Sequence, residues 1–167
     1  MASFHTKTFS THNLYYTPKS AWEAIVQYLP EKPIIWEAFS ISSSRSADYL
    51  RELGYTVLSP PADFFLTDFS RVADIIVSNP PYDLVKTIMP RLLEIDMPFC
   101  LLMPSSKINT NYFREWSDKN IQIIIPRKRI QFDKDNDGTV TCGNKCNFDC
   151  FYYCYKMNLP KDIIWLN

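Results

Sequence analysis

Short apolar runs recur along the chain and alternate with stretches that have helical spacing. The apolar runs cover residues 33–37, 55–58, 73–77, 99–103, 121–125 and 148–155. Strand-length runs separated by helices are typical of α/β proteins with a largely parallel sheet. We therefore predict an α/β fold with a mostly parallel sheet, in which the last two runs pair as an antiparallel closing hairpin.

Apolar residues at helical spacing predict helices over residues 18–29, 47–53, 84–95 and 109–116. Thr17 is expected to cap the first of these helices, with Pro18 at its first helical position. Gly54 is expected to end the second. No linker or repeat interrupts the pattern, so we predict a single domain over residues 1–167, with residues 1–16 as a candidate N-terminal arm.

Composition excludes several classes of protein. No apolar run approaches the roughly 18 residues of a membrane span, and no apolar stretch follows the first basic residue as in a secretory signal. We expect an intracellular protein, cytoplasmic or nuclear, whose five cysteines are thiols.

Three glycines cannot build a glycine-rich phosphate loop. The 18 basic and 18 acidic residues cancel, so binding to a polyanion requires a local basic patch.

The tetrapeptide Asn79-Pro80-Pro81-Tyr82 directly follows the third apolar run. In parallel sheets, ligands bind beyond the carboxyl ends of the strands, where this tetrapeptide is expected to lie. The side-chain oxygen of Asn79 and the carbonyl oxygen of Pro80 can accept both hydrogens of a planar amine, while Pro81 restricts the backbone. Tyr82 can stack on the planar group that carries the amine.

At these residues the chain resembles class I S-adenosylmethionine-dependent N-methyltransferases of the NPPY type. The family implies a Rossmann-like fold, S-adenosylmethionine as cofactor, and methyl transfer to adenine N6 in DNA or RNA, with catalysis at Asn79, Pro80, Pro81 and Tyr82. By the same resemblance, the cofactor-binding residues are Thr17, Pro18, Glu37, Phe39, Asp63 and Phe64. Their order along the chain is the gamma arrangement of this family. The chain is most similar to the short members found in large DNA viruses, which suggests a virus-associated location.

Two features depart from the family pattern. The loop over residues 40–45 contains no glycine, and no carboxylate occurs between residues 59 and 62, where an acidic residue usually binds the cofactor's ribose. Two alternatives therefore remain open. The first is a catalytically inactive methyltransferase-like protein that serves as a binding or assembly subunit. The second is a protein glutamine N-methyltransferase, because the same tetrapeptide suits a side-chain amide.

The densest basic cluster is Arg127-Lys128-Arg129, which predicts a contact with the backbone of DNA or RNA. Ordinary solvated loop charges are the alternative. The chain is too short for a separate target-recognition domain, so a protein partner is a candidate source of specificity.

We predict no metal site. Residues 133–140 match half of a calcium-binding loop, but Asn144 stands where that loop needs glutamate, and a polar hairpin is the simpler interpretation. Cys142, Cys146, Cys150 and Cys154 are evenly spaced, unlike paired zinc ligands, and are interpreted as core thiols. His5 and His12 have no companion motif.

Overall fold

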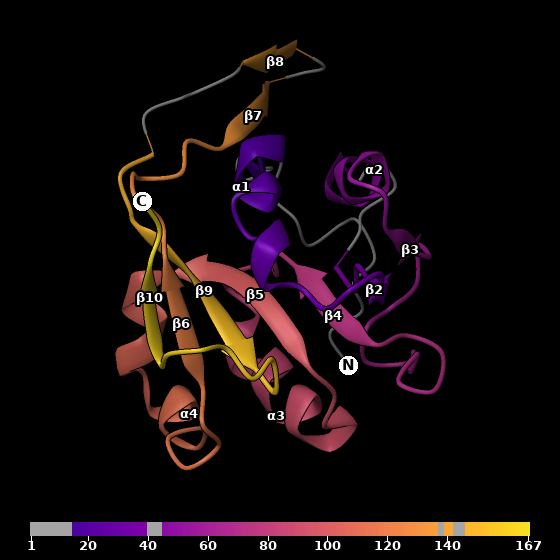
Figure 1. The fold of residues 1–167 in the computed structure, drawn as a ribbon, viewed down its shortest axis with the longest axis vertical. Coiled ribbons are helices and arrows are strands. Elements are labelled where there is room, and N and C mark those ends of the chain that lie inside the picture. The colour runs from indigo at the N-terminus through magenta and orange to yellow at the C-terminus, as the bar shows by residue number, and fades with distance from the viewer. Residues whose placement is uncertain (1–14, 40–44, 137–138, 142–145) are drawn as a thin grey trace.

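A computed structural model describes residues 15–39, 45–136, 139–141 and 146–167. Its main sheet consists of β2 (Ile34–Trp36), β3 (Thr56–Leu58), β4 (Ile75–Ser78), β5 (Phe99–Pro104), β6 (Gln122–Ile125), β9 (Cys150–Tyr155) and β10 (Ile163–Trp165). The spatial order is β10-β6-β9-β5-β4-β2-β3 (Figure 1). Six strands are parallel to one another, and β9 runs antiparallel between β5 and β6. The predicted α/β class, the mostly parallel sheet and the antiparallel pairing of the last two predicted runs are confirmed.

A second, small sheet joins the start of the described chain to a late hairpin. It consists of β1 (Tyr15–Tyr16), β7 (Asp133–Asn136) and β8 (Thr139–Thr141), all antiparallel. The segment considered for calcium therefore forms a hairpin, although residues 137, 138 and 144 lie outside the described residues, as does most of the N-terminal arm.

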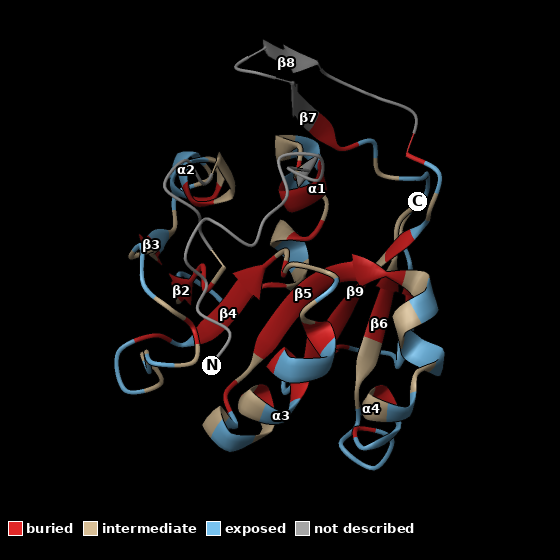
Figure 2. Cartoon of the chain, turned by 180° about the vertical axis from the view of Figure 1, so that it is seen from behind, coloured by how far each residue is buried: buried red, intermediate tan, exposed pale blue. Residues whose placement is uncertain are grey.

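The helices are α1 (Lys19–Glu23), α2 (Arg45–Glu52), α3 (Val85–Ile95) and α4 (Asn111–Arg114), together with the 3-10 turns η1 (Val26–Tyr28) and η2 (Ser105–Asn109). Figure 2 shows the buried central strands β4, β5 and β9 and the exposed outer faces of the helices. No helix in the described ranges has the length and apolar character needed to cross a membrane.

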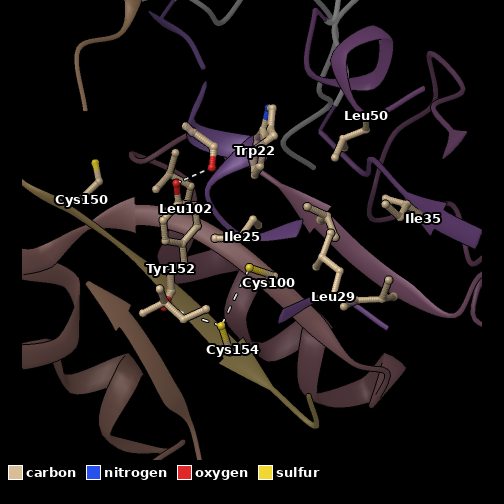
Figure 3. Packing of buried hydrophobic residues seen from close by; sticks show 14 of the residues in the cluster. Trp22, Ile25, Leu29, Ile35, Leu50, Cys100, Leu102, Cys150, Tyr152 and Cys154 are labelled. Atoms are coloured by element: carbon tan, nitrogen blue, oxygen red, sulfur yellow. Dashed lines mark hydrogen bonds between the residues drawn. The ribbon is translucent and has the colours of Figure 1, made fainter. Parts of the chain in front are cut away.

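The two faces of the main sheet carry separate apolar clusters. On one face, α1 and α2 contribute Trp22 and Leu50, which belong to the same cluster as Tyr152 and Cys154 of β9 (Figure 3). On the other face, residues of α3 and α4 join Tyr153 and Tyr155 of the same strand. Successive side chains of a strand point to opposite faces, so β9 supplies a buried row to each cluster. Cys150 and Cys154 are buried on one of these faces, so their interpretation as core thiols is confirmed.

The first helix begins one residue later than predicted. Pro18 occupies the N-cap position without a side-chain capping bond, and the hydroxyl of Thr17 instead accepts a hydrogen bond from Asn79. The predicted helix is also split, because the amide of Tyr28 bonds to the carbonyl of Ile25 in a 3-10 turn. Gly54 follows α2 with a φ of +96°, a conformation that favours glycine, so the predicted end of that helix is confirmed.

Candidate functional site

The parallel strands of the main sheet end at one edge, and the predicted site residues follow them there. Glu37 follows β2, Asn79 follows β4, and the basic cluster follows β6 after Pro126. The antiparallel strand β9 begins at this edge, with Cys150 paired to Pro104. Beyond the carboxyl ends of parallel strands is where α/β proteins place their ligands.

Asn79 is held by its side-chain nitrogen. Its Nδ2 atom donates a 3.0 Å hydrogen bond to Oγ1 of Thr17, from the segment that precedes α1. Its Oδ1 atom is buried and has no hydrogen-bond partner among the described residues. A buried carbonyl oxygen without a partner costs about 1–3 kcal/mol. Asn79 therefore presents an acceptor that a ligand with an N–H group could satisfy.

Strand and turn geometry fix the backbone around Asn79. All four residues of β4 are buried, and so is Pro80, two residues after the strand ends. The amide of Leu84 bonds to the carbonyl of Pro81, which closes a turn just before α3. Lys107 of η2 donates to the backbone carbonyl of Tyr82 over 2.9 Å, so a side chain from the neighbouring strand connection also secures this turn.

Tyr82 packs against the segment that leads into β9. Its ring lies edge-on to Phe148 with 5.8 Å between centroids, and its hydroxyl oxygen lies 3.7 Å from Sγ of Cys150. Burial raises the pKa of the Tyr82 hydroxyl well above its usual value, and the neighbouring Cys150 adds to this effect. The side chain as a whole is only half-buried. Tyr82 is thus a neutral ring fixed by Phe148 and Cys150.

Glu37 and Ser78 form a buried polar pair at the ends of two adjacent strands. The hydroxyl of Ser78 donates to Oε1 of Glu37, and both residues are buried. The amide of Glu37 bonds in turn to the carbonyl of Leu58 at the end of β3. The predicted acidic residue therefore lies at the sheet edge, bound to the residue that precedes Asn79. Its partner Ser78 was not predicted, although it directly precedes the tetrapeptide.

Asp63 and Phe64 lie in a turn after β3, and Phe64 belongs to an aromatic cluster. Oδ1 of Asp63 accepts a hydrogen bond from the amide of Phe65, and the residue is half-exposed. Phe64 is only 1% exposed and packs against Trp36 and Phe39, at centroid distances of 5.6 and 4.7 Å. The structure brings Phe39 and Phe64 together, with the Phe64 ring in the core. The glycine-free loop that follows Phe39 lies outside the described residues, up to Arg45.

An arginine that was not predicted lies at the end of β3. Nη2 of Arg51 donates to Oγ of Ser59 at 2.7 Å and to the carbonyl oxygen of Val57 at 3.1 Å. Its Nη1 atom forms an ion pair with Asp48 on the same helix. The guanidinium of Arg51 therefore lies at the end of β3, where residues 59–62 contain no carboxylate.

All three residues of the basic cluster are exposed, and Arg129 is bound to a neighbouring segment. Arg127 and Lys128 are exposed and form no ion pair with the described residues. Arg129 makes two hydrogen bonds to the carboxylate of Asp149, at 2.8 and 3.0 Å, and a third to the carbonyl oxygen of Cys146. Asp149 raises the pKa of Arg129, and Arg129 lowers that of Asp149, because each stabilises the charged form of the other.

A groove of about 370 Å³ runs beside this cluster. It is lined by Ala21 of α1, by Ala24 directly after this helix, by residues 126–131, and by Tyr152 of β9. The hydroxyl of Tyr152 donates to the carbonyl of Ala21 over 2.6 Å, which holds α1 to the sheet at the base of the groove. Apolar atoms make up most of its lining, and the exposed cations belong to its wall.

The cysteines of the described residues are buried thiols. Cys100 and Cys154 face each other across β5 and β9 with 3.9 Å between their sulfur atoms (Figure 3). Burial raises the pKa of Cys150 to about 12. Within the described ranges no group of three or more histidine, cysteine or acidic side chains could hold a metal ion. Cys142, His5 and His12 lie outside those ranges.

Sequence reasoning did not identify Lys107, Phe148 or Cys150 as residues near the tetrapeptide. Lys107 follows β5 by three residues, and its position beside a neighbouring strand end is a signal that topology could have supplied. Phe148 and Cys150 reach Tyr82 only through the antiparallel insertion of β9 next to β5. No local sequence signal marks that contact.

No protein-family model matches the chain, and no curated protein is found to match it.

Proposed function

We propose that the protein transfers a methyl group from S-adenosylmethionine to an exocyclic amine, most directly N6 of adenine in DNA or RNA. The observation that carries this proposal is the buried Oδ1 atom of Asn79, which lacks a partner among the described residues while its amide nitrogen is bound to Thr17. An acceptor oriented in this way at the carboxyl edge of a parallel sheet suits a ligand N–H group.

The two acceptors account for the reactivity of a planar amine. Its nitrogen lone pair is delocalised into the neighbouring ring, so the free amine is a weak nucleophile. When Asn79 Oδ1 and the carbonyl oxygen of Pro80 accept its two hydrogens, they stabilise the positive charge that develops on nitrogen as it forms the new bond to carbon. The bond between this carbon and the donor sulfur would break as the new bond forms, and one N–H proton would pass to solvent water, which leaves a neutral, methylated amine.

When bound, S-adenosylmethionine supplies a methyl group activated by a positively charged sulfur. In the proposal, Glu37 and Asp63 are the acidic residues that would hold it. Asp63 suits this role because it is half-exposed and fixed by the amide of Phe65. The end of β3 is different, since Arg51 and Ser59 offer donors where ribose hydroxyls usually meet a carboxylate. Recognition of the ribose would therefore depend on these donors.

The basic wall of the groove supports nucleic acid as the substrate. Arg127 and Lys128 carry charges without ion pairs among the described residues, and the groove beside them is formed partly by α1, the helix that follows Thr17. A phosphate backbone bound here would pass close to the segment that orients Asn79. Charge on this wall would attract a polyanion even though the whole chain is neutral.

The first experiment is calorimetric titration with S-adenosylmethionine and with its demethylated product. We expect micromolar binding that is lost in Asp63→Ala. Methyl transfer is then measured on adenine-containing oligonucleotides and on a glutamine-containing peptide. Asn79→Ala should abolish transfer, whereas Asn79→Asp, which keeps an acceptor oxygen, should retain part of it. A folded protein that binds neither compound would contradict the proposal and support the non-catalytic alternative, and transfer to the peptide alone would support the glutamine alternative.

A further inference from the structure

Residues 146–150 form a short segment that is bound to the loop after β6. Arg129 holds it through Asp149 and through the carbonyl oxygen of Cys146. The amide of Cys146 also donates to the side-chain oxygen of Gln131 over 2.9 Å. At its other end, the carbonyl of Asp149 accepts a hydrogen bond from the amide of Ser105. Contacts from two loops therefore fix the segment.

The same segment supplies two side chains that contact the Tyr82 side chain. Phe148 lies against the Tyr82 ring and also stacks on Phe132 with 6.0 Å between centroids. Sγ of Cys150 lies beside the Tyr82 hydroxyl. Asp149 lies between Phe148 and Cys150 in the sequence. The carboxylate that binds Arg129 is therefore flanked by the two residues that contact the Tyr82 side chain.

Arg129 differs from Arg127 in what its side chain does. The guanidinium of Arg129 makes three hydrogen bonds to residues 146 and 149, in the two-pronged geometry that lysine cannot reproduce. Arg127 forms no ion pair with the described residues. Three of the five N–H groups of the Arg129 guanidinium are thereby bound to residues 146 and 149. The guanidinium of Arg129 therefore binds the 146–150 segment.

We propose that Arg129 is a positioning residue for the acceptor site: through Asp149 and Cys146 it holds Phe148 and Cys150, and thereby fixes the ring of Tyr82. The consequence for methyl transfer rests on the function proposed above. A base that stacks on Tyr82 would then be oriented by an arginine that never touches it. The sequence-based prediction that Arg129 contacts nucleic acid stays a prediction.

The position of Tyr82 can be measured without any activity. The protein is labelled with 3-fluorotyrosine, and the ¹⁹F resonance of Tyr82 is assigned from the spectrum of Tyr82→Phe. We expect this resonance to shift or broaden in Arg129→Ala and Asp149→Ala, and the double variant to add little, because both changes break the same contact. Arg129→Lys should restore the signal only in part. Arg127→Ala removes an equal charge from the same loop and should leave the signal unchanged.

Kinetics then tests the effect on the reaction. In Arg129→Ala we expect kcat to fall about 10- to 100-fold, because a small displacement of a group that orients the substrate has effects of this size, with KM for S-adenosylmethionine unchanged. An unchanged Tyr82 resonance in both single variants would overturn the proposal, as would faster methyl transfer, since the contacts would then restrain the ring in an unproductive position. If the resonance responds as expected but the wild-type protein transfers no methyl group, the positioning holds and the proposed function fails.

Discussion

The side-chain nitrogen of Asn79 lies 3.0 Å from the hydroxyl oxygen of Thr17 and donates a hydrogen bond to it. The bond joins the end of β4 to the residue before Pro18, 62 positions away in the chain. Because the nitrogen is bound in this way, the oxygen of the same amide is left as a buried acceptor. Thr17, expected from the sequence to cap a helix, instead orients the side chain of Asn79.

Thr17→Val should destabilise the protein and slow the methyl transfer proposed above. Valine keeps the shape of threonine but removes the oxygen that accepts from Asn79, so a buried amide nitrogen loses its partner. We expect a loss of about 1–2 kcal/mol in the free energy of unfolding, measured by urea denaturation, and slower methyl transfer. Thr17→Ser is the matched control because it keeps the hydroxyl. Equal stability of the valine and serine variants would show that the bond contributes nothing.

Six strands of the main sheet could be predicted from the sequence because each is a short apolar run. Other elements carry no comparable local signal. β1 is two residues long and depends on pairing with β7, which lies more than a hundred residues later. β10 was not predicted although Ile163, Ile164 and Trp165 are apolar, since a run of three residues is shorter than the four to eight residues by which a strand is recognised in a sequence.

The position of the candidate site could also be predicted, because the carboxyl ends of parallel strands share one edge. Glu37 and Asn79 lie there, as expected. The sequence could not reveal which of the candidate side chains already contact other residues of the chain. The engagement of Arg129 by Asp149, and that of Tyr82 by Phe148, depend on where β9 inserts into the sheet, and only long-range pairing decides this.

Tyr152→Phe should weaken the attachment of α1 to the sheet and lower the free energy of unfolding. The buried hydroxyl of Tyr152 donates to the carbonyl of Ala21, and its loss leaves that carbonyl without this donor. We expect unfolding in urea to require about 1–2 kcal/mol less than in the wild type. Tyr28→Phe removes a hydroxyl that makes no hydrogen bond to the described residues, so it should be close to neutral. If the two variants lose stability equally, the bond to Ala21 is not a stabilising contact.

Stability should decline at alkaline pH, in part because of Cys150. Burial raises the pKa of this thiol to about 12, whereas an unfolded cysteine ionises near 8.5. A raised folded pKa means that its contribution is complete below about pH 8.5 and is lost as the pH rises toward 12. Between pH 8 and pH 10 the loss amounts to about 2 kcal/mol for this group.

The contribution of Cys150 is isolated by comparison with Cys150→Ala. Urea unfolding of both proteins is measured at pH 8 and pH 10 in the presence of a reductant. Buried tyrosines with raised pKa values, such as Tyr152, lower the stability of both proteins alike over this range. The alanine variant should therefore show a shallower decline than the wild type, and parallel declines would mean that the thiol ionises as readily in the folded state as in the unfolded one.

Binding to single-stranded nucleic acid should depend on salt through Arg127 and Lys128. Each phosphate contact releases counterions, and for single strands the slope of log K against log salt is about −0.7 per contact. Removing both cations with Arg127→Ala and Lys128→Ala should therefore make the slope less negative by about 1.4, as measured by fluorescence anisotropy at several salt concentrations. Arg71→Ala with Lys86→Ala removes the same charge from exposed positions away from the groove lining. If that control changes the slope as much as the groove variant does, then net charge governs binding and the groove wall has no special part in it.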